Sequence, residues 1–258
     1  MILPIKERLA RGETLRVMVL GALASPKLIE LVGLHAGLDG VWIDQEHSAI
    51  PHHDLELMMM ACRAAGLDAF ARVPPTDYGT IMRPMEAGAS GIMVAQIRTI
   101  DQVKQVLEWA KYPPLGARGL FMNNYEARYG TADVKEHIAE SNRDRWICIQ
   151  IETPEAVECA DEIAAMDGVD HLFVGTADLA CTLGVPGEML HAKCVEALTK
   201  VSAAASRAGK TWGALVRSTE HAAQCRKLGC ALFSLMADLD VVHRGIKAAR
   251  AAYGDFFD

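Results

Sequence analysis

Short apolar blocks alternate with longer amphipathic segments along almost the whole chain. Eight of these blocks have the near-continuous apolar character of parallel strands that are covered on both faces. They are RVMVLGAL (16–23), DGVWID (39–44), DAFARV (68–73), GIMVA (91–95), WICIQIE (146–152), HLFVG (171–175), TWGALV (211–216) and ALFSL (231–235). The segments between them favour helices. Residues 99–112 gather their apolar side chains on one face, and residues 153–166 open with Thr153 as N-cap and Pro154 at the first helical position.

Eight strand–helix units in 258 residues predict an α/β fold, a (β/α)₈ TIM barrel that forms a single domain over residues 1–258. The alternative is an open doubly wound sheet, which would favour a glycine-rich turn after its first strand. Residues 20–27, LGALASPK, contain one glycine there, which disfavours that alternative. Residues 112–145 form an unusually long connection, and we expect this segment to close over a site.

Composition narrows the choice of partners and of compartment. The net charge of -7 and the absence of any Lys/Arg cluster disfavour nucleic acid. The first 15 residues carry charges where a signal peptide would be apolar, and no later segment stays apolar long enough to span a bilayer, so we expect a cytoplasmic protein. Seven cysteines without a C-x-x-C pair indicate reduced thiols rather than disulfides or a thiolate metal site.

Polar residues gather where the predicted strands end, which is where barrel enzymes place their catalytic groups. They are Asp44, Glu46 and His47 after the second strand, Arg72 in the third, Gln150 and Glu152 in the fifth, and Thr176, Ala177 and Asp178 after the sixth. This is the candidate site.

Gln150 and Glu152 alternate with isoleucines and therefore project to the same side of their strand. If that side is the barrel interior, their burial costs several kcal/mol unless they are hydrogen-bonded or coordinate a cation. Asp178 alone would be interpreted as a helix cap. Together with Glu152 it predicts a hard oxygen site, suited to Mg²⁺ or Mn²⁺.

The residues after the second strand indicate acid–base chemistry. Asp44 lies three residues before His47, and an Asp–His pair orients an imidazole and raises its basicity. Arg72 has two interpretations, a structural pair with a barrel carboxylate or a catalytic cation. Glu46 either supports the metal through water or caps the next helix.

Several of these segments, in this order and spacing, resemble the HpcH/HpaI family of class II pyruvate aldolases. They are WIDQEHSAI (42–50), ARVP (71–74), YPPLGARG (112–119), IQIETPEAV (149–157) and VDHLFVGTADLACTLG (169–184). The family includes 4-hydroxy-2-oxoheptanedioate aldolase and the 2-keto-3-deoxy sugar acid aldolases. The resemblance implies a barrel of the phosphoenolpyruvate/pyruvate type. It also implies reversible cleavage of a 4-hydroxy-2-oxo acid to pyruvate and an aldehyde through a metal-bound enolate.

The resemblance also implies a role for each candidate residue. Glu152 and Asp178 would ligate Mg²⁺ or Mn²⁺, with Co²⁺ or Zn²⁺ as other options. Gln150 and the backbone amides near Ala177 and Asp178 would hold pyruvate.

Two further roles concern the reacting atoms. Arg72 would stabilise the enolate oxygen, and His47, oriented by Asp44, would move the proton of the 4-hydroxyl. The family resemblance further implies a homo-oligomer, a trimer or a hexamer with exchanged C-terminal helices.

Other chemistries stay open at this point. A Schiff-base aldolase is disfavoured because no lysine falls at the end of a predicted strand. A CoA-thioester lyase of the citrate lyase beta or malyl-CoA lyase type, an oxo-acid decarboxylase and a non-catalytic metabolite-binding barrel are the alternatives.

The chain departs from the family pattern in a few places. Thr176 replaces a common proline, Gln45 replaces a frequent glycine, and residues 120–130 are larger than usual. Roles for Met236 and Asp238 stay open.

Overall fold

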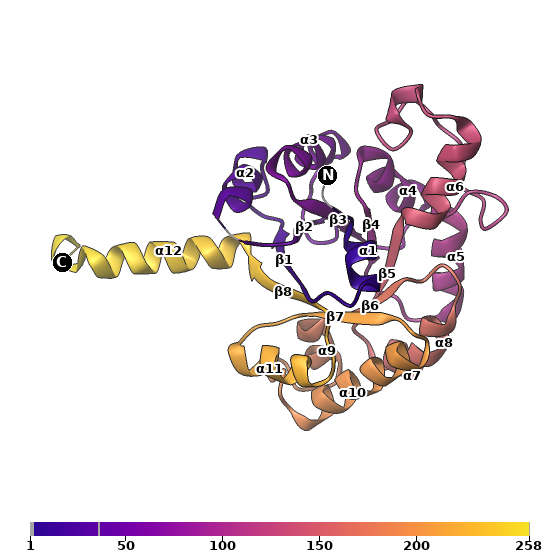
Figure 1. Ribbon diagram of the computed structural model, residues 1–258. Coiled ribbons are helices and arrows are strands. Elements are labelled where there is room, and N and C mark those ends of the chain that lie inside the picture. Colours follow the sequence, from indigo (N-terminus) through magenta and orange to yellow (C-terminus); the bar gives the residue numbers. More distant parts are fainter. Residues whose placement is uncertain (1–2, 36, 258) are drawn as a thin grey trace.

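In the computed structural model, which describes residues 3–35 and 37–257, eight strands form a closed parallel barrel (Figure 1). The strands are β1 (Leu15–Leu20), β2 (Gly40–Asp44), β3 (Asp68–Val73), β4 (Gly91–Val94), β5 (Trp146–Ile151), β6 (His171–Val174), β7 (Thr211–Leu215) and β8 (Leu232–Ala237). Each pairs with the next in sequence, and β8 closes the barrel on β1. The predicted (β/α)₈ barrel is therefore confirmed, and each strand lies within or close to its predicted block.

Helices connect the strands, and most of them cover the outer side of the barrel (Figure 1). They are α1 (Ile5–Ala10), α2 (Pro26–His35), α3 (His52–Ala65), α4 (Tyr78–Ala87), α5 (Ile100–Ala110), α6 (Val134–Asp144), α7 (Pro154–Glu158), α8 (Ala160–Ala165), α9 (Thr176–Thr182), α10 (Ala192–Arg207), α11 (Thr219–Lys227) and α12 (Asp238–Ala252), with 3₁₀ turns η1 (Arg128–Gly130) and η2 (Gly254–Phe256). Thr153 caps α7 as predicted. The single helix expected over 153–166 is instead two, because Cys159 has a ψ of 3°, outside the helical range.

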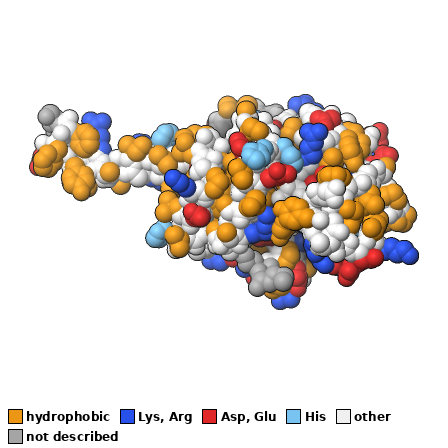
Figure 2. All heavy atoms as spheres, turned by 90° about the horizontal axis from the view of Figure 1, so that it is seen from above, with side chains coloured by type: hydrophobic (Ala, Val, Ile, Leu, Met, Phe, Trp, Pro, Cys, Tyr) orange, Lys and Arg blue, Asp and Glu red, His pale blue; other side chains and the backbone are white. Residues whose placement is uncertain are grey.

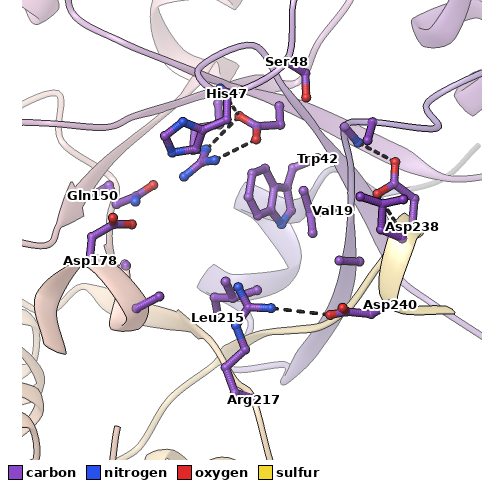
Figure 3. A pocket seen from close by; sticks show the side chains of 18 of the residues that line it. Val19, Trp42, His47, Ser48, Gln150, Asp178, Leu215, Arg217, Asp238 and Asp240 are labelled. Carbon is purple, nitrogen blue, oxygen red and sulfur yellow. Dashed lines mark hydrogen bonds and ion pairs between the residues drawn. The ribbon is translucent and has the colours of Figure 1, made fainter. Parts of the chain in front are cut away.

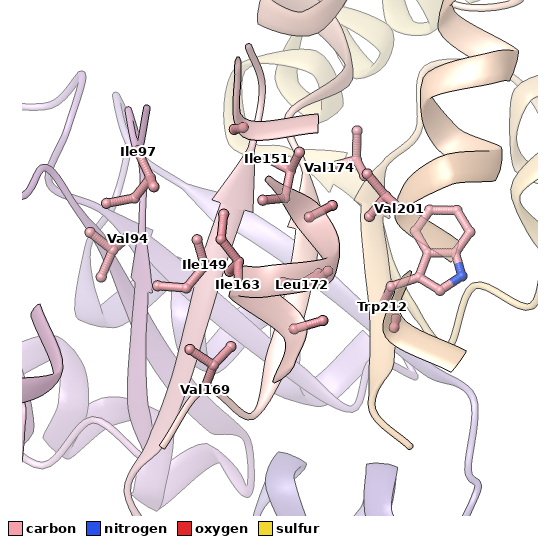
Figure 4. Close-up of a cluster of buried hydrophobic side chains, with 14 of the residues drawn as sticks. Val94, Ile97, Ile149, Ile151, Ile163, Val169, Leu172, Val174, Val201 and Trp212 are labelled. Atoms are coloured by element: carbon pink, nitrogen blue, oxygen red, sulfur yellow. The ribbon is translucent and has the colours of Figure 1, made fainter. Parts of the chain in front are cut away.

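Two layers of apolar side chains hold the barrel together. The inner layer fills the barrel with large side chains such as Trp42, Phe70 and Trp146. Ile5 and Leu9 of α1 close the bottom of the barrel, the end at which the strands begin. The outer layer packs the strands against the helices. Figure 4 shows part of it between β4, β5, β6 and β7. A barrel packed in this way fixes the positions of the strand ends, where the polar residues lie.

The long segment 112–145 does not close over the barrel, so that expectation was wrong. It contributes no side chain to the cavity at the barrel mouth, which is described below. Buried ion pairs hold the segment together, with Arg118 at 2.5 Å from Glu126. Tyr125 is held to the outside of the barrel by Arg63 of α3, whose guanidinium lies 3.6 Å from the centre of the Tyr125 ring.

Helix α12 projects away from the barrel, and its far end is the C-terminal end of the chain (Figure 1). Apart from Asp238 at its start, its residues are not buried, and hydrophobic side chains lie along the projecting arm (Figure 2). Within the described ranges, no helix is long and apolar enough to cross a membrane. All seven cysteines are free thiols, five of them buried.

His171 of β6 is a fully buried histidine near the bottom of the barrel. Its Nδ1 atom lies 2.7 Å from the Thr211 hydroxyl, and its ring lies beside Trp146. Burial lowers the pKa of His171 from 6.5 to about 3, because the imidazolium would lose its hydration. The folded state therefore binds this proton more weakly than the unfolded state.

This difference in pKa makes stability depend on pH. The neutral imidazole costs nothing above pH 6.5, and the folded state loses stability as the pH falls from there toward 3. Between pH 7 and pH 5 we expect His171 to reduce the free energy of unfolding by about 2 kcal/mol. Urea denaturation at both pH values should show a smaller loss for His171→Asn. The exposed His53→Asn variant should retain the wild-type loss, and an unchanged loss in His171→Asn would contradict the assignment.

Candidate active site

A cavity of about 450 Å³ opens at the carboxyl end of the barrel. It is lined by the ends of seven strands and by the start of α12, including Val19, Trp42, Asp44, His47, Arg72, Gln150, Phe173, Ala177, Asp178, Leu215, Arg217, Ala237, Asp238 and Asp240. Figure 3 shows Gln150 and Asp178 together on one side of the cavity, with Asp238 and Asp240 across from them. The structure thus brings the polar strand ends predicted from the sequence to one place.

Arg72 is fixed at the cavity wall by two carboxylates. The register of β2 and β3 places Asp44 directly beside Arg72, and the guanidinium donates to both Asp44 carboxylate oxygens, at 2.9 and 2.7 Å. Glu46 lies 3.0 Å from the third guanidinium nitrogen. Burial alone would raise the pKa of Asp44, but the hydrogen bonds and charge of Arg72 outweigh it and hold that pKa below its usual value. Arg72 is therefore a preorganised cation.

The predicted Asp44–His47 imidazole pair is not formed, so this part of the prediction was wrong. The Asp44 carboxylate is committed to Arg72 and to the backbone amides of Glu46 and His47. The His47 imidazole lines the cavity and is 62% exposed, and its Nε2 atom lies 3.8 Å from the Glu46 carboxylate. Glu46 does not cap the next helix, whose N-cap is Pro51. Its carboxylate lies between Arg72 and His47.

Gln150 and Glu152 point inward from β5, as their alternation predicted. The Gln150 amide donates to one oxygen of Glu152, and the other oxygen accepts a hydrogen bond of 2.6 Å from the backbone of Gln96. Glu152 is fully buried. Burial, reinforced by the charges of Glu46 and Asp178, raises the pKa of Glu152 to about 7. Among the described residues, the hydrogen-bond partners of this carboxylate are two neutral amides.

The turn after β6 approaches this carboxylate closely. A Cβ atom on Gly175 would lie 2.5 Å from both the Gln150 amide nitrogen and a Glu152 oxygen, so only glycine fits there. Asp178 follows in the first turn of α9 and faces the cavity. Asp178 is thereby brought close enough to Glu152 for its negative charge to raise the pKa of Glu152.

These residues fit a hard divalent cation. Glu152 and Asp178 supply two carboxylates, and the side-chain oxygen of Gln150 is buried without a hydrogen-bond partner among the described residues. Over residues 3–35 and 37–257, no three His, Cys, Asp or Glu side chains converge on one point. An ion here would take its other ligands from water and substrate, as Mg²⁺ commonly does.

Two departures from the family pattern have visible contacts. The Thr176 hydroxyl donates a hydrogen bond of 2.6 Å to the carbonyl of Leu215, which ties the turn after β6 to the end of β7. Asp238 accepts hydrogen bonds from the backbone amides of Gly21 and Leu23, both 2.8 Å long. These two bonds join the start of α12 to the loop after β1.

The sequence did not single out Gln96, Arg217 or Asp240. Gln96 donates through its backbone amide and has a positive φ of 55°. The identity of the side chain gives no indication of either feature. Arg217 and Asp240 follow the last two strands. Their position after strand ends could have added them to the candidate set, but their contact joins distant parts of the chain.

Sequence comparison identifies the family of the chain. The profile of the HpcH/HpaI aldolase/citrate lyase family matches residues 16–244. A 5-keto-4-deoxy-D-glucarate aldolase of Klebsiella pneumoniae is 32% identical over 220 residues, which cover 85% of each chain.

Solved structures give the same result. An HpcH/HpaI aldolase/citrate lyase family protein from Burkholderia cenocepacia is 31% identical, with a TM-score of 0.89 over 96% of this chain and 98% of that one. The citrate synthase SbnG is 26% identical, with a TM-score of 0.87 over 98% of each chain. The resemblance drawn from the sequence motifs is confirmed, and the chain belongs to the HpcH/HpaI aldolase/citrate lyase family.

Proposed function

We propose that this chain is a divalent-metal-dependent aldolase that cleaves a 4-hydroxy-2-oxo acid reversibly to pyruvate and an aldehyde. The observation that carries the proposal is a cavity lined by the fixed cation Arg72 and by Gln150, whose amide donates to the fully buried carboxylate of Glu152. Carbon–carbon cleavage leaves negative charge on the pyruvyl fragment, and this arrangement suits its stabilisation. The family and its aldolase relatives support the same reaction class.

Glu152 and Asp178 would hold the divalent ion, with Mg²⁺ or Mn²⁺ favoured by the all-oxygen donors. When bound, the ion supplies Lewis-acid stabilisation of the negative charge that develops during cleavage. Gln150 would orient the keto acid beside it. The backbone of Ala177 and Asp178, at the cavity wall, would receive the pyruvate carboxylate.

His47 and Arg72 would act on the reacting atoms, His47 by transferring a proton and Arg72 by stabilising negative charge. His47 accepts the proton of the 4-hydroxyl, the C3–C4 bond breaks, and the electron pair passes to the C2 carbonyl to form the enolate. Arg72 stabilises the enolate oxygen, and protonation of C3 completes pyruvate. Asp44 acts as a positioning residue because its two hydrogen bonds hold the guanidinium in place.

The alternatives are less well supported. No lysine is among the described residues that line the cavity, so a Schiff base is disfavoured. A CoA-thioester lyase, a decarboxylase or a binding barrel would use the same pocket. The first experiment below separates the lyase and the binding barrel from an aldolase, whereas a decarboxylase would form the same enolate and is distinguished by its lack of aldol addition of pyruvate to an aldehyde.

Exchange of the pyruvate methyl protons in D₂O tests enolate formation without knowledge of the aldehyde. We expect NMR to show exchange with Mg²⁺ or Mn²⁺ and none with EDTA. Glu152→Gln should slow exchange by about 100-fold or more, because the ion's stabilisation of the enolate is worth several kcal/mol. Thermal unfolding of the same variant confirms that it folds. Absence of exchange with every metal would overturn the aldolase proposal in favour of an alternative.

We further propose that α12 packs on a second copy of the chain within a homo-oligomer. The helix leaves the second half of β8 uncovered, since Leu235 on that strand is 38% exposed, whereas a (β/α)₈ barrel ordinarily covers each strand with a helix. Along α12, Val242 and Ile246 are exposed one turn apart. An exchanged α12 from another copy would cover both apolar surfaces.

Light scattering coupled to size exclusion tests this assembly. We expect an oligomer for the wild type and a smaller mass for the double variant Val242→Asp/Ile246→Asp, because charges would be buried in the contact. Lys247→Asp, which adds an aspartate to a neighbouring face of the helix, should keep the wild-type mass. A monomeric wild type, or an unchanged mass in the double variant, would rule out the exchange.

A further inference from the structure

Trp42 is a large aromatic side chain at the boundary between the apolar interior of the barrel and the cavity. It lies on β2, two residues before Asp44, and is 2% exposed. Its ring lines the cavity beside Val19, its register partner on β1 (Figure 3). The Phe70 ring on β3 is stacked with it, at 6.5 Å between ring centres and 17° between ring planes. The chemistry described above gives Trp42 no role.

A buried hydrogen bond fixes the orientation of the Trp42 ring. The indole Nε1 atom donates to the Ser234 hydroxyl of β8 at 3.0 Å, and Ser234 is fully buried. A leucine or phenylalanine at position 42 would be apolar throughout, whereas a buried indole N–H costs stability unless it is bonded. The bond to Ser234 therefore indicates that the orientation of this ring matters in addition to its volume.

The Arg72 guanidinium lies over the Trp42 ring, with its central carbon 4.9 Å from the ring centre. This distance is within the range of about 6 Å for a cation–π interaction, and Trp is the aromatic side chain that attracts a cation most strongly. Arg72 is 7% exposed, so water weakens the attraction less than it would at the surface. The ring is thus an energetic partner of the cation as well as a neighbour.

The Trp42 ring adds a constraint that the Asp44 carboxylate does not supply. Asp44 accepts two N–H groups of Arg72, and these groups lie in the plane of the guanidinium. The two bonds fix the cation within its plane but leave the plane free to tilt about the line to the carboxylate. A ring packed against the guanidinium opposes this tilt. The tilt decides where the remaining N–H groups point, and hence whether they meet an oxygen that gains negative charge.

We propose that Trp42 is a positioning residue that fixes the tilt of the Arg72 guanidinium through a cation–π contact, and that Ser234 in turn orients Trp42. The effect of Trp42 on the reaction then passes through Arg72. This inference rests on the proposed function, in which Arg72 stabilises the enolate oxygen.

A double-mutant cycle between Trp42 and Arg72 tests this dependence. Trp42→Leu should lower the rate of pyruvate methyl exchange at saturating pyruvate by about 3- to 30-fold, because a cation–π contact to a cation that acts in the transition state is lost. Trp42→Phe keeps an aromatic face without the bond to Ser234 and should give an intermediate rate.

Arg72→Lys supplies the second side of the cycle, since it keeps a positive charge that has no plane to tilt. In that background, Trp42→Leu should change the remaining rate by less than about twofold. Equal losses in the two backgrounds would show that Trp42 does not act through Arg72.

Fluorinated tryptophans test the electrostatic part of the contact with little change in the shape of the ring. Each fluorine withdraws electrons from the ring face and weakens its attraction for a cation. Site-specific incorporation at position 42 should therefore lower the exchange rate stepwise with the number of fluorines. The same analogues at Trp146, which is buried but is not among the described residues that line the cavity, should leave the rate unchanged. A rate that is independent of fluorination at position 42 would overturn the inference.

Binding of Mn²⁺, measured on the same preparations, separates the possible causes of a slow rate. The proposed ligands Glu152 and Asp178 do not contact Arg72 through hydrogen bonds within the described ranges, so Trp42→Leu should keep the wild-type affinity for Mn²⁺. A loss of affinity as large as the loss of rate would mean that Trp42 supports the whole site, which contradicts the inference. A wild type without exchange overturns the aldolase function itself, whereas equal losses in both backgrounds of an active wild type overturn the role of Trp42 alone.

Discussion

The buried carboxylate of Glu152 is the constraint on which the rest of the site depends. It lies inside the barrel, where burial and the charges of Glu46 and Asp178 raise its pKa to about 7. A fully buried group in this state costs stability unless a cation completes it. The surrounding contacts fix the orientation of the Glu152 carboxylate. The Gln96 amide orients one oxygen, Gln150 occupies the other, and Gly175 leaves the space that any larger residue would fill.

The site also requires a positive charge that does not move. Arg72 meets this requirement because Asp44 and Glu46 hold three of its nitrogen atoms. A cation held in this way needs no reorganisation when negative charge develops on the substrate. The barrel fixes the positions of these side chains, because each of them comes from a strand or from the turn directly after it. The exposed His47 and Arg217 lie nearer the mouth, where protons and aldehydes enter.

The sequence predicted the strands well because strands covered on both faces are apolar blocks, and it placed the polar residues correctly at their ends. It failed where contacts join distant residues. Asp44 was paired with its sequence neighbour His47, but the register of β2 and β3 places it against Arg72. The segment 112–145 was assigned to the mouth because of its length, whereas the buried Arg118–Glu126 pair makes it a compact unit on the outside. Aligning the two predicted strands at Gly40 and Asp68 would have found the first of these contacts.

Direct binding of Mn²⁺ tests the central claim, that Glu152 and Asp178 together hold a divalent ion. Electron paramagnetic resonance of free Mn²⁺ during titration gives the number of sites and their affinity. The account predicts one site per chain in the wild type, weakened by at least about tenfold in both Glu152→Gln and Asp178→Asn. Asp240→Asn, at the same cavity but outside the ligand pair, should bind as the wild type does. Unchanged binding in both carboxylate variants would contradict the account and place the ion elsewhere.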